Sequence, residues 1–356
     1  MLALLLGLVA DRAIVVGRVD DGAWSDAPTE ARLDQKVELA AIVVAHRGKQ
    51  RVVLAPPGVS KVKLGGHAVH VEPLPDAKAH WFAVEPHGFR STPAKNGATS
   101  TFYSNVSTES ASFGKWLGYD HIDYFERALA ADSPIMTAAI DSADAVMPGL
   151  GTEFFKVDVE LGDAHVASPG AESIDTYGIT RAVHRVSIRR ADDFLGWLTA
   201  YLLVPEVFGS AGPGRDHQSE RFTGADCADV MVGAMRRSGH ALAYTNVAGL
   251  PAYTMVVAGA TELDEHGTPA HRITGVRAGD LIRIDYGGAL RHHTPRDWDH
   301  VAALWQDRSD PKGPHHGDPD GELDGFDLVI HMGHPRLVIE PLAEQAPATV
   351  DVLRWR

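Results

Sequence analysis

The sequence predicts an α+β protein in which a β-rich, sandwich-like domain precedes a domain built from a helix packed on an antiparallel sheet. Three observations lead to this prediction. At 356 residues, the chain is long enough for about two domains. From residue 32 to 190, short apolar alternations are interrupted by Gly and Pro, which is typical of β structure. From residue 191 an acidic pair introduces an apolar run, which is typical of a helix N-terminus.

The composition narrows the class of partner. The net charge is −14 and hydrophobic residues make up 44% of the chain. Nucleic acids and anionic membranes reward clustered Lys and Arg, so this charge argues against both as the main partner. The chain has one cysteine and therefore no internal disulfide.

Residues 1–24 have two interpretations. The first ten residues are apolar and stop at Asp11 and Arg12. They form either the core of a secretory signal, with Ala10 at the cleavage site, or a buried first strand that resumes at Ala13. The signal predicts a secreted or periplasmic protein, and the strand leaves a cytoplasmic location open. No other run approaches membrane length, so we expect no integral membrane segment.

The first predicted domain, residues 25–190, carries several strands and no evident catalytic set. Residues 155–161 alternate cleanly between apolar and other side chains, as a half-buried strand does. Apolar residues at helical spacing between positions 122 and 131 predict one helix inside this domain. Its ligand cannot be inferred from these patterns.

Cys227 is the most informative residue of the second predicted domain, residues 191–356. Asp226 is suited to cap a helix that begins at Cys227, and Gly239 is suited to end it. The free N–H groups of a helix N-terminus favour a thiolate and can bind an oxyanion. A small cysteine buried by packing is the alternative.

Two histidines on predicted strands favour the catalytic interpretation. His300 begins one apolar run and His331 ends the next. A cysteine on a helix start, a histidine on a strand and a polar residue beyond it can act as nucleophile, base and orienting group. His300 would take the thiol proton or hold a thiolate–imidazolium pair, and His331 would accept from the far ring nitrogen of His300.

Five short motifs resemble, in their order and in their residues, those of the NlpC-type cell-wall endopeptidases, a papain-like cysteine peptidase family. The resemblance covers the C-terminal half and implies a papain-like domain that hydrolyses amide bonds in peptidoglycan stem peptides or another peptide substrate. It also implies a Cys-His-His triad. The motifs are residues 204–210, Asp226-Cys227-Ala228-Asp229, Gly279-Asp280-Leu281, His300-Val301-Ala302 and Val329-Ile330-His331.

Further residues receive roles near this site. We expect Asp226, Ala228 and Glu206 at or near the oxyanion site, although the family usually has Tyr where Glu206 stands. Arg283 and Arg296 are candidates for binding a substrate carboxylate.

Two other functions remain open at this point. One is a non-catalytic cell-wall or glycan-binding protein with a degenerate peptidase fold. The other is a metal-dependent hydrolase that uses Cys227, His300 and His331 as ligands. The cysteine peptidase needs neither a cofactor nor a metal. The loop Asp318–Asp327 spaces its carboxylates like a weak calcium site, and a polar turn is the alternative.

Overall fold

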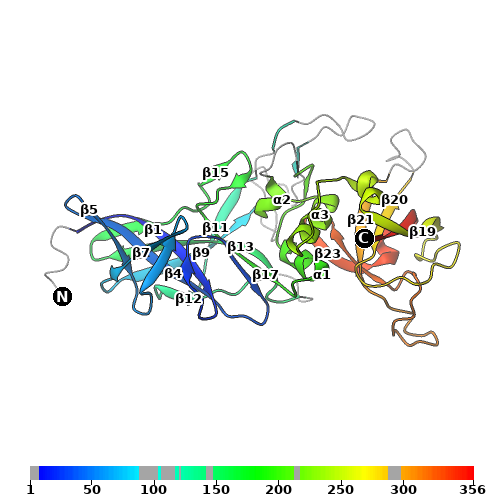
Figure 1. Cartoon of the computed structure of the whole chain (residues 1–356), viewed down its shortest axis with the longest axis horizontal. Coiled ribbons are helices and arrows are strands. Elements are labelled where there is room, and N and C mark those ends of the chain that lie inside the picture. The colour runs from blue at the N-terminus through cyan, green and yellow to red at the C-terminus, as the bar shows by residue number, and fades with distance from the viewer. Residues whose placement is uncertain are drawn as a thin grey trace. The chain divides into compact units, whose positions relative to one another are not determined.

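The computed structural model describes residues 8–87, 103–105, 117–119, 122–141, 147–211, 217–287 and 298–356. The chain divides into two compact units, which we describe separately (Figure 1). The first unit contains the described residues up to 87 and from 122 to 190. The second contains residues 103–105 and 117–119 and everything from Ala191 onward.

The first unit contains two larger sheets. The first sheet has the order β7 (His67–His70), β6 (Lys61–Leu64), β2 (Trp24–Ser25), β1 (Leu8–Val19), β4 (Val37–Arg47), β5 (Gln50–Ala55) and β8 (Glu72–Pro73), and β12 (Ile135–Thr137) also pairs with β4. Residues 8–19 form a strand that pairs with β4 along its whole length, with an irregularity between Ala10 and Arg12. The first seven residues of the N-terminal run lie outside the described residues.

The first sheet must be rolled. Its edge strands β7 and β8 are separated in the chain by Val71 alone. Consecutive Cα atoms are about 3.8 Å apart, so His70 and Glu72 bring the two edges within about 7 Å of each other. The inner face carries a buried apolar cluster that includes Val16, Ile42 and Val53.

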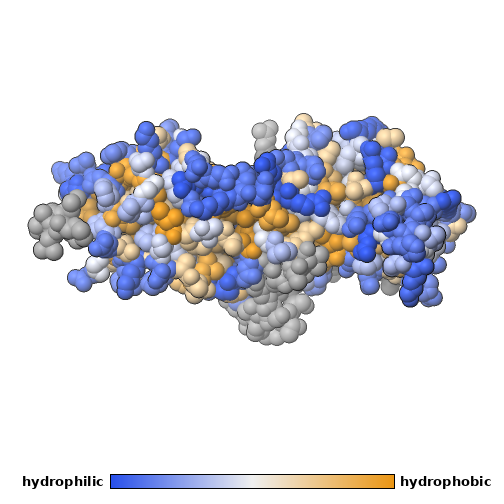
Figure 2. Space-filling view, turned by 90° about the horizontal axis from the view of Figure 1, so that it is seen from below, coloured by the Kyte–Doolittle hydropathy of each residue, from blue (hydrophilic) through white to orange (hydrophobic). Residues whose placement is uncertain are grey.

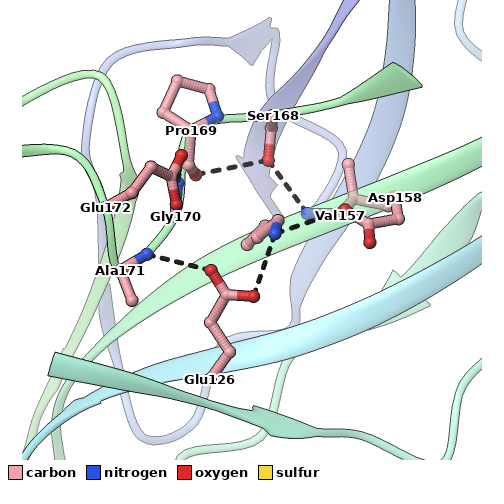
Figure 3. A network of polar contacts seen from close by, with 9 residues as sticks. Glu126, Val157, Asp158, Ser168, Pro169, Gly170, Ala171 and Glu172 are labelled. Atoms are coloured by element: carbon pink, nitrogen blue, oxygen red, sulfur yellow. Dashed lines mark hydrogen bonds and ion pairs between the residues drawn. The ribbon is translucent and has the colours of Figure 1, made fainter. Parts of the chain in front are cut away.

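The second sheet has the order β11 (Tyr124–Ala128), β9 (Lys78–Pro86), β13 (Gly151–Leu161), β17 (His184–Arg189) and β3 (Thr29–Arg32), with β14 (Ala164–Ala167) beside β13. A small hairpin joins β15 (Ile174–Asp175) to β16 (Gly178–Ile179). Figure 3 shows how polar contacts hold the loop at residues 168–172 on this sheet. Glu126 accepts from the backbone N of Ala171 at 3.0 Å and from Lys156 Nζ at 2.9 Å.

The second unit is built on one six-stranded sheet. Its order is β19 (Thr254–Leu263), β24 (Ala348–Trp355), β20 (Leu281–Asp285), β21 (His300–Gln306), β22 (Leu328–Met332) and β23 (Leu337–Pro341), and every neighbouring pair is antiparallel. The strands β20, β21 and β22 contribute Ile282, Leu304 and Val329 to one buried cluster. This sheet supplies the rigid support for both candidate histidines.

Short helices accompany this sheet: α1 (Phe194–Leu198), α2 (Gln218–Arg221), α3 (Cys227–Arg237) and the 3-10 turns η2 (Thr199–Tyr201), η3 (Val247–Ala252) and η5 (Leu342–Gln345). Helix α3 packs on β21 and β22 and also against α1. Gly233 allows α3 to lie close to Tyr201 of η2, because a Cβ at position 233 would overlap the Tyr201 hydroxyl.

The prediction of an α+β, papain-like fold class is wrong. Strands dominate both units, whereas the α-helices α1, α2 and α3 have 5, 4 and 11 residues. The chain is therefore a mostly β protein with several sheets, in which α3 is a minor element. Residues 124–128, expected in a helix, form strand β11. There Ile122 and Tyr124 are buried at a spacing of two, which is the period of a strand.

One segment of the second unit comes from the N-terminal half of the chain. Strand β10 (Tyr103–Ser104) pairs in parallel with β18 (Val207–Phe208). Asn105 is fully buried and donates to Gln218 Oε1 at 2.7 Å and to the carbonyl oxygen of Gly209 at 3.3 Å. A division of the chain at residue 190 alone would have missed this strand.

In the described part of the chain, no helix has the length and hydropathy needed to cross a membrane. The face shown in Figure 2 is largely hydrophilic, with apolar side chains interspersed. Large exposed apolar residues include Val9, Leu117 and Val256.

Candidate active site

Helix α3 begins at Cys227, and Asp226 fixes its first turn. Asp226 has an extended backbone, and its Oδ1 accepts from the backbone N of Asp229 at 2.9 Å. Its Oδ2 accepts from the backbone N of Gly209 at 3.0 Å, in the segment that pairs with β10. The carboxylate thus caps the helix and ties it to the neighbouring loop, which leaves the Cys227 thiol half-buried at the helix start.

The surroundings of the thiol favour its neutral form. Burial, and then the charge of Asp226, raise the pKa of Cys227 well above the usual range. Hydrogen bonding from the backbone of Val301 and Ala228 acts in the opposite direction. The helix N-terminus was expected to favour a thiolate, but desolvation and the neighbouring carboxylates outweigh it here.

His300 is the residue before Val301, and its ring contacts His331. The His300 Nε2 and the His331 Nδ1 are 2.9 Å apart, and the two rings are nearly perpendicular at 87°. Burial, and then the charge of His331, lower the pKa of His300 to about 3. His300 is therefore a neutral imidazole at physiological pH, and its surroundings disfavour the protonated form.

Glu340 on β23 completes the hydrogen-bond chain. Its Oε1 lies 3.1 Å from the Nε2 of His331, and this bond is the first cause that lowers the pKa of Glu340. An ionised carboxylate only accepts, so His331 Nε2 carries the hydrogen. In a neutral His331 the Nδ1 then accepts, and His300 Nε2 must donate to it. This assignment leaves the Nδ1 of His300 as the free proton acceptor.

Two further side chains hold Glu340 and the rings in place. Gln345, from η5, donates from Nε2 to Glu340 Oε1 at 2.6 Å, and its Oε1 accepts from the Tyr286 hydroxyl. The Tyr286 ring lies 6.2 Å from that of His300. Burial, and then the charge of Cys227, raise the pKa of Tyr286, which places its hydroxyl in the electrostatic environment of the thiol.

Glu206 forms a second polar pair close to the site. Its Oε2 accepts from His334 Nδ1 at 2.8 Å, and its backbone N donates to the carbonyl of Pro335. Burial raises the pKa of Glu206, while His334 acts against this, and the charges of Asp226 and His331 also reach it. The residue expected near the oxyanion site therefore lies near Asp226 and His331.

The remaining candidate residues have different surroundings. Ala228 is buried in the first turn of α3, where its backbone contributes to the thiol environment. Arg283 is 7% exposed, donates from Nε to Asp351 Oδ1 at 3.0 Å and stacks on Trp298. Its guanidinium is thus engaged by Asp351 and Trp298 within the fold. Arg296 lies outside the described residues.

The loop expected as a weak calcium site uses its carboxylates for turns. Asp324 accepts from the backbone N of Phe326 at 2.8 Å, and Asp327 accepts from those of Arg308 and Asp324. Among the residues that the structure describes, no group of three or more His, Cys, Asp or Glu could hold a metal ion. Cys227, His300 and His331 are all described residues and do not form such a group, so their geometry does not support the metal-dependent alternative.

Sequence reasoning missed Glu340, Gln345 and Tyr286. A signal for Glu340 exists, because residues 328–341 contain two short apolar runs that form the hairpin β22–β23. Val338 pairs with His331, so Glu340, two residues later, lies on the same face of the sheet. Gln345 is the last residue of the short 3-10 turn η5 and Tyr286 follows the end of β20, and no periodicity indicates either.

Comparisons with family models, with curated proteins and with solved structures give no match for this chain.

Proposed function

We propose that the second unit is a cysteine hydrolase that cleaves amide bonds, with Cys227 as nucleophile. The observation that carries the proposal is the hydrogen-bonded chain of His300, His331 and Glu340. The first residue of this chain, His300, directly precedes Val301, whose backbone hydrogen-bonds the thiol. A purely structural cysteine has no need of such a chain. The proposal rests on these side chains and not on a papain-like fold.

The mechanism starts from a neutral thiol and a neutral imidazole, because the raised pKa of Cys227 and the lowered pKa of His300 both disfavour an ion pair before the attack. The Cys227 thiol transfers its proton to His300 as its sulfur bonds to the amide carbonyl carbon. The Nε2 of the resulting imidazolium keeps its hydrogen bond to His331 Nδ1, which Glu340 holds in place from the other side of the ring. The tetrahedral intermediate then breaks its C–N bond, and His300 returns the proton to the leaving amine. Water, deprotonated by His300, attacks the thioester, and the C–S bond breaks to release the acid and restore the thiol.

The backbone around the thiol suits the anionic intermediate. The backbones of Ala228, in the first turn of α3, and of Val301 hydrogen-bond the sulfur, and the same groups could bind an oxyanion formed beside it. For the substrate we propose the peptide portion of peptidoglycan, on the strength of the motif resemblance. Such a substrate would require a secreted or periplasmic protein.

The experiment compares the wild type with Cys227→Ala and Cys227→Ser on peptidoglycan fragments and on free peptides, measuring new amines. We expect both variants to lose activity while keeping the circular dichroism spectrum of the wild type. A covalent acyl adduct at Cys227, detected by mass spectrometry, is expected in the wild type alone. Amine release that survives in Cys227→Ala would refute the proposal.

The raised pKa of the thiol favours a second candidate, a non-catalytic binding protein with an inert cysteine. Alkylation of the single cysteine separates the two. Proton transfer to His300 predicts reaction with iodoacetamide at neutral pH that His300→Gln suppresses. A binding protein predicts slow alkylation that is the same in both proteins.

A further inference from the structure

The rolled first sheet contains a cavity of about 650 Å³ at one end. This volume falls within the range of small-molecule sites in proteins, about 300–1,000 Å³. Its apolar lining includes Ile14, Val53 and Val69. Ile14 and Val69 pack against the buried cluster of the sheet and Val53 belongs to it, so the cavity is an open continuation of the core.

Two exposed arginines, Arg12 and Arg51, lie at the edge of the apolar cavity lining. Arg12 precedes Ile14 by two residues on β1, and Arg51 precedes Val53 by two on β5. Side chains two apart share a face of a strand, so both arginines continue the inner face of the sheet. Both line the cavity and both are exposed.

The two carboxylates of the cavity are already engaged. Both oxygens of Glu72 accept from Arg47, at 3.3 and 2.7 Å. Asp26 accepts from the backbone N of Gly65. Within the described residues, the side chains of Arg12 and Arg51 have neither a hydrogen bond nor an ion pair, in a chain whose net charge is −14. One excess positive charge therefore remains at the mouth after Asp26 is counted.

We propose that this cavity binds a small ligand with an apolar body that ends in a single carboxylate. The body would occupy the surface formed by Ile14, Val53 and Val69, and the carboxylate would lie between Arg12 and Arg51. Guanidinium groups match a carboxylate with paired N–H donors, and these hydrogen bonds are stronger than those between neutral groups. A monocarboxylate also balances the excess charge, which a dianionic phosphate would exceed.

The test uses the full chain and a fluorescent probe of this chemistry, 11-(dansylamino)undecanoic acid, with its methyl amide as the neutral counterpart. We expect saturable binding of the acid and at least tenfold weaker binding of the amide. Arg12→Gln and Arg51→Gln should each weaken the acid roughly tenfold, since each removes a charge-assisted contact. Lys63→Gln is the matched control, because Lys63 is exposed and alternates with the inward Val62 and Leu64 on β6.

Competition then identifies the source of the carboxylate. Displacement by decanoate indicates a fatty-acid-like ligand, and displacement by N-acetyl-leucyl-leucine indicates a peptide C-terminus. Cys227→Ala should bind the probe as the wild type does, because the site lies in the first unit and does not depend on catalysis. Equal affinity for acid and amide, arginine variants that match Lys63→Gln, or displacement by neither competitor would overturn the proposal.

Discussion

Glu340→Gln tests whether the charge at the end of the histidine chain reaches the thiol. The variant keeps the shape of the side chain and an oxygen that accepts from His331, but removes the negative charge. A hydrogen bond to a charged group contributes about 1.5–3 kcal/mol, against about 0.5–1.5 kcal/mol for a neutral one. The difference is about 1–1.5 kcal/mol, which corresponds to roughly a 5- to 12-fold change in rate. We therefore expect proton transfer from Cys227 to slow by that factor.

The assay is the second-order rate of Cys227 alkylation by iodoacetamide at pH 7, followed by mass spectrometry. The single cysteine makes the labelling site unambiguous. Glu340→Leu should slow the reaction further, because it leaves the buried N–H of His331 without its acceptor, at about 1–3 kcal/mol. Glu344→Gln, an exposed residue of η5, is the matched control. If both Glu340 variants react as fast as Glu344→Gln, the histidine chain is not coupled to the thiol.

Three more predictions follow from the second unit. Because burial lowers the pKa of His300 to about 3, the acid limb of amide hydrolysis should lie near pH 3–4, and a limb near pH 6.5 in kcat/KM would contradict a buried neutral base. Burial, and then Asp226, raise the pKa of Asp229 well above its usual range, so its contribution to stability is present at low pH and is lost as the pH rises above about 4. In Asp229→Asn the unfolding free energy should therefore fall less between pH 5 and 9 than in the wild type. Urea titrations at each pH measure this free energy, and an equal fall with pH in both proteins would argue against the prediction. Arg283→Met should cost about 3–5 kcal/mol because it leaves Asp351 buried without its partner, and the double variant with Asp351→Leu should recover most of the loss. Urea midpoints of the three proteins measure this, and a double variant as unstable as Arg283→Met would show that the pair itself is not the cause.

Local signals predicted the start of α3 because its chemistry is local. Asp226 as N-cap, Cys227 as first residue and basic residues in the last turn are all within one short segment. The strands at His300 and His331 were also readable, since each is a continuous apolar run. Their mutual approach depends on the pairing of β21 with β22, which the sequence indicates only through the order of the runs.

The predicted fold class was wrong because the helices expected from the sequence are short or absent. The apolar run from Phe194 ends as helix α1 after five residues and continues as a 3-10 turn. Burial at Ile122 and Tyr124 follows a strand period, although Ile122 and Phe125 also satisfy a helical one. Short apolar runs fit both periods, and the pairing of β11 with β9, far apart in sequence, decides between them.

The buried strand β10 determines which fragments of this protein can be expected to stand alone. A fragment that starts at Ala191 would lack Tyr103 and Asn105, so it would expose the free edge of β18 and remove the hydrogen bond that Asn105 donates to the buried Gln218. That edge continues directly into Gly209, whose N–H binds the cap of the cysteine helix. The second unit is therefore not encoded in one continuous stretch, and a gene fragment meant to produce it has to include residues that interrupt the sequence of the first unit.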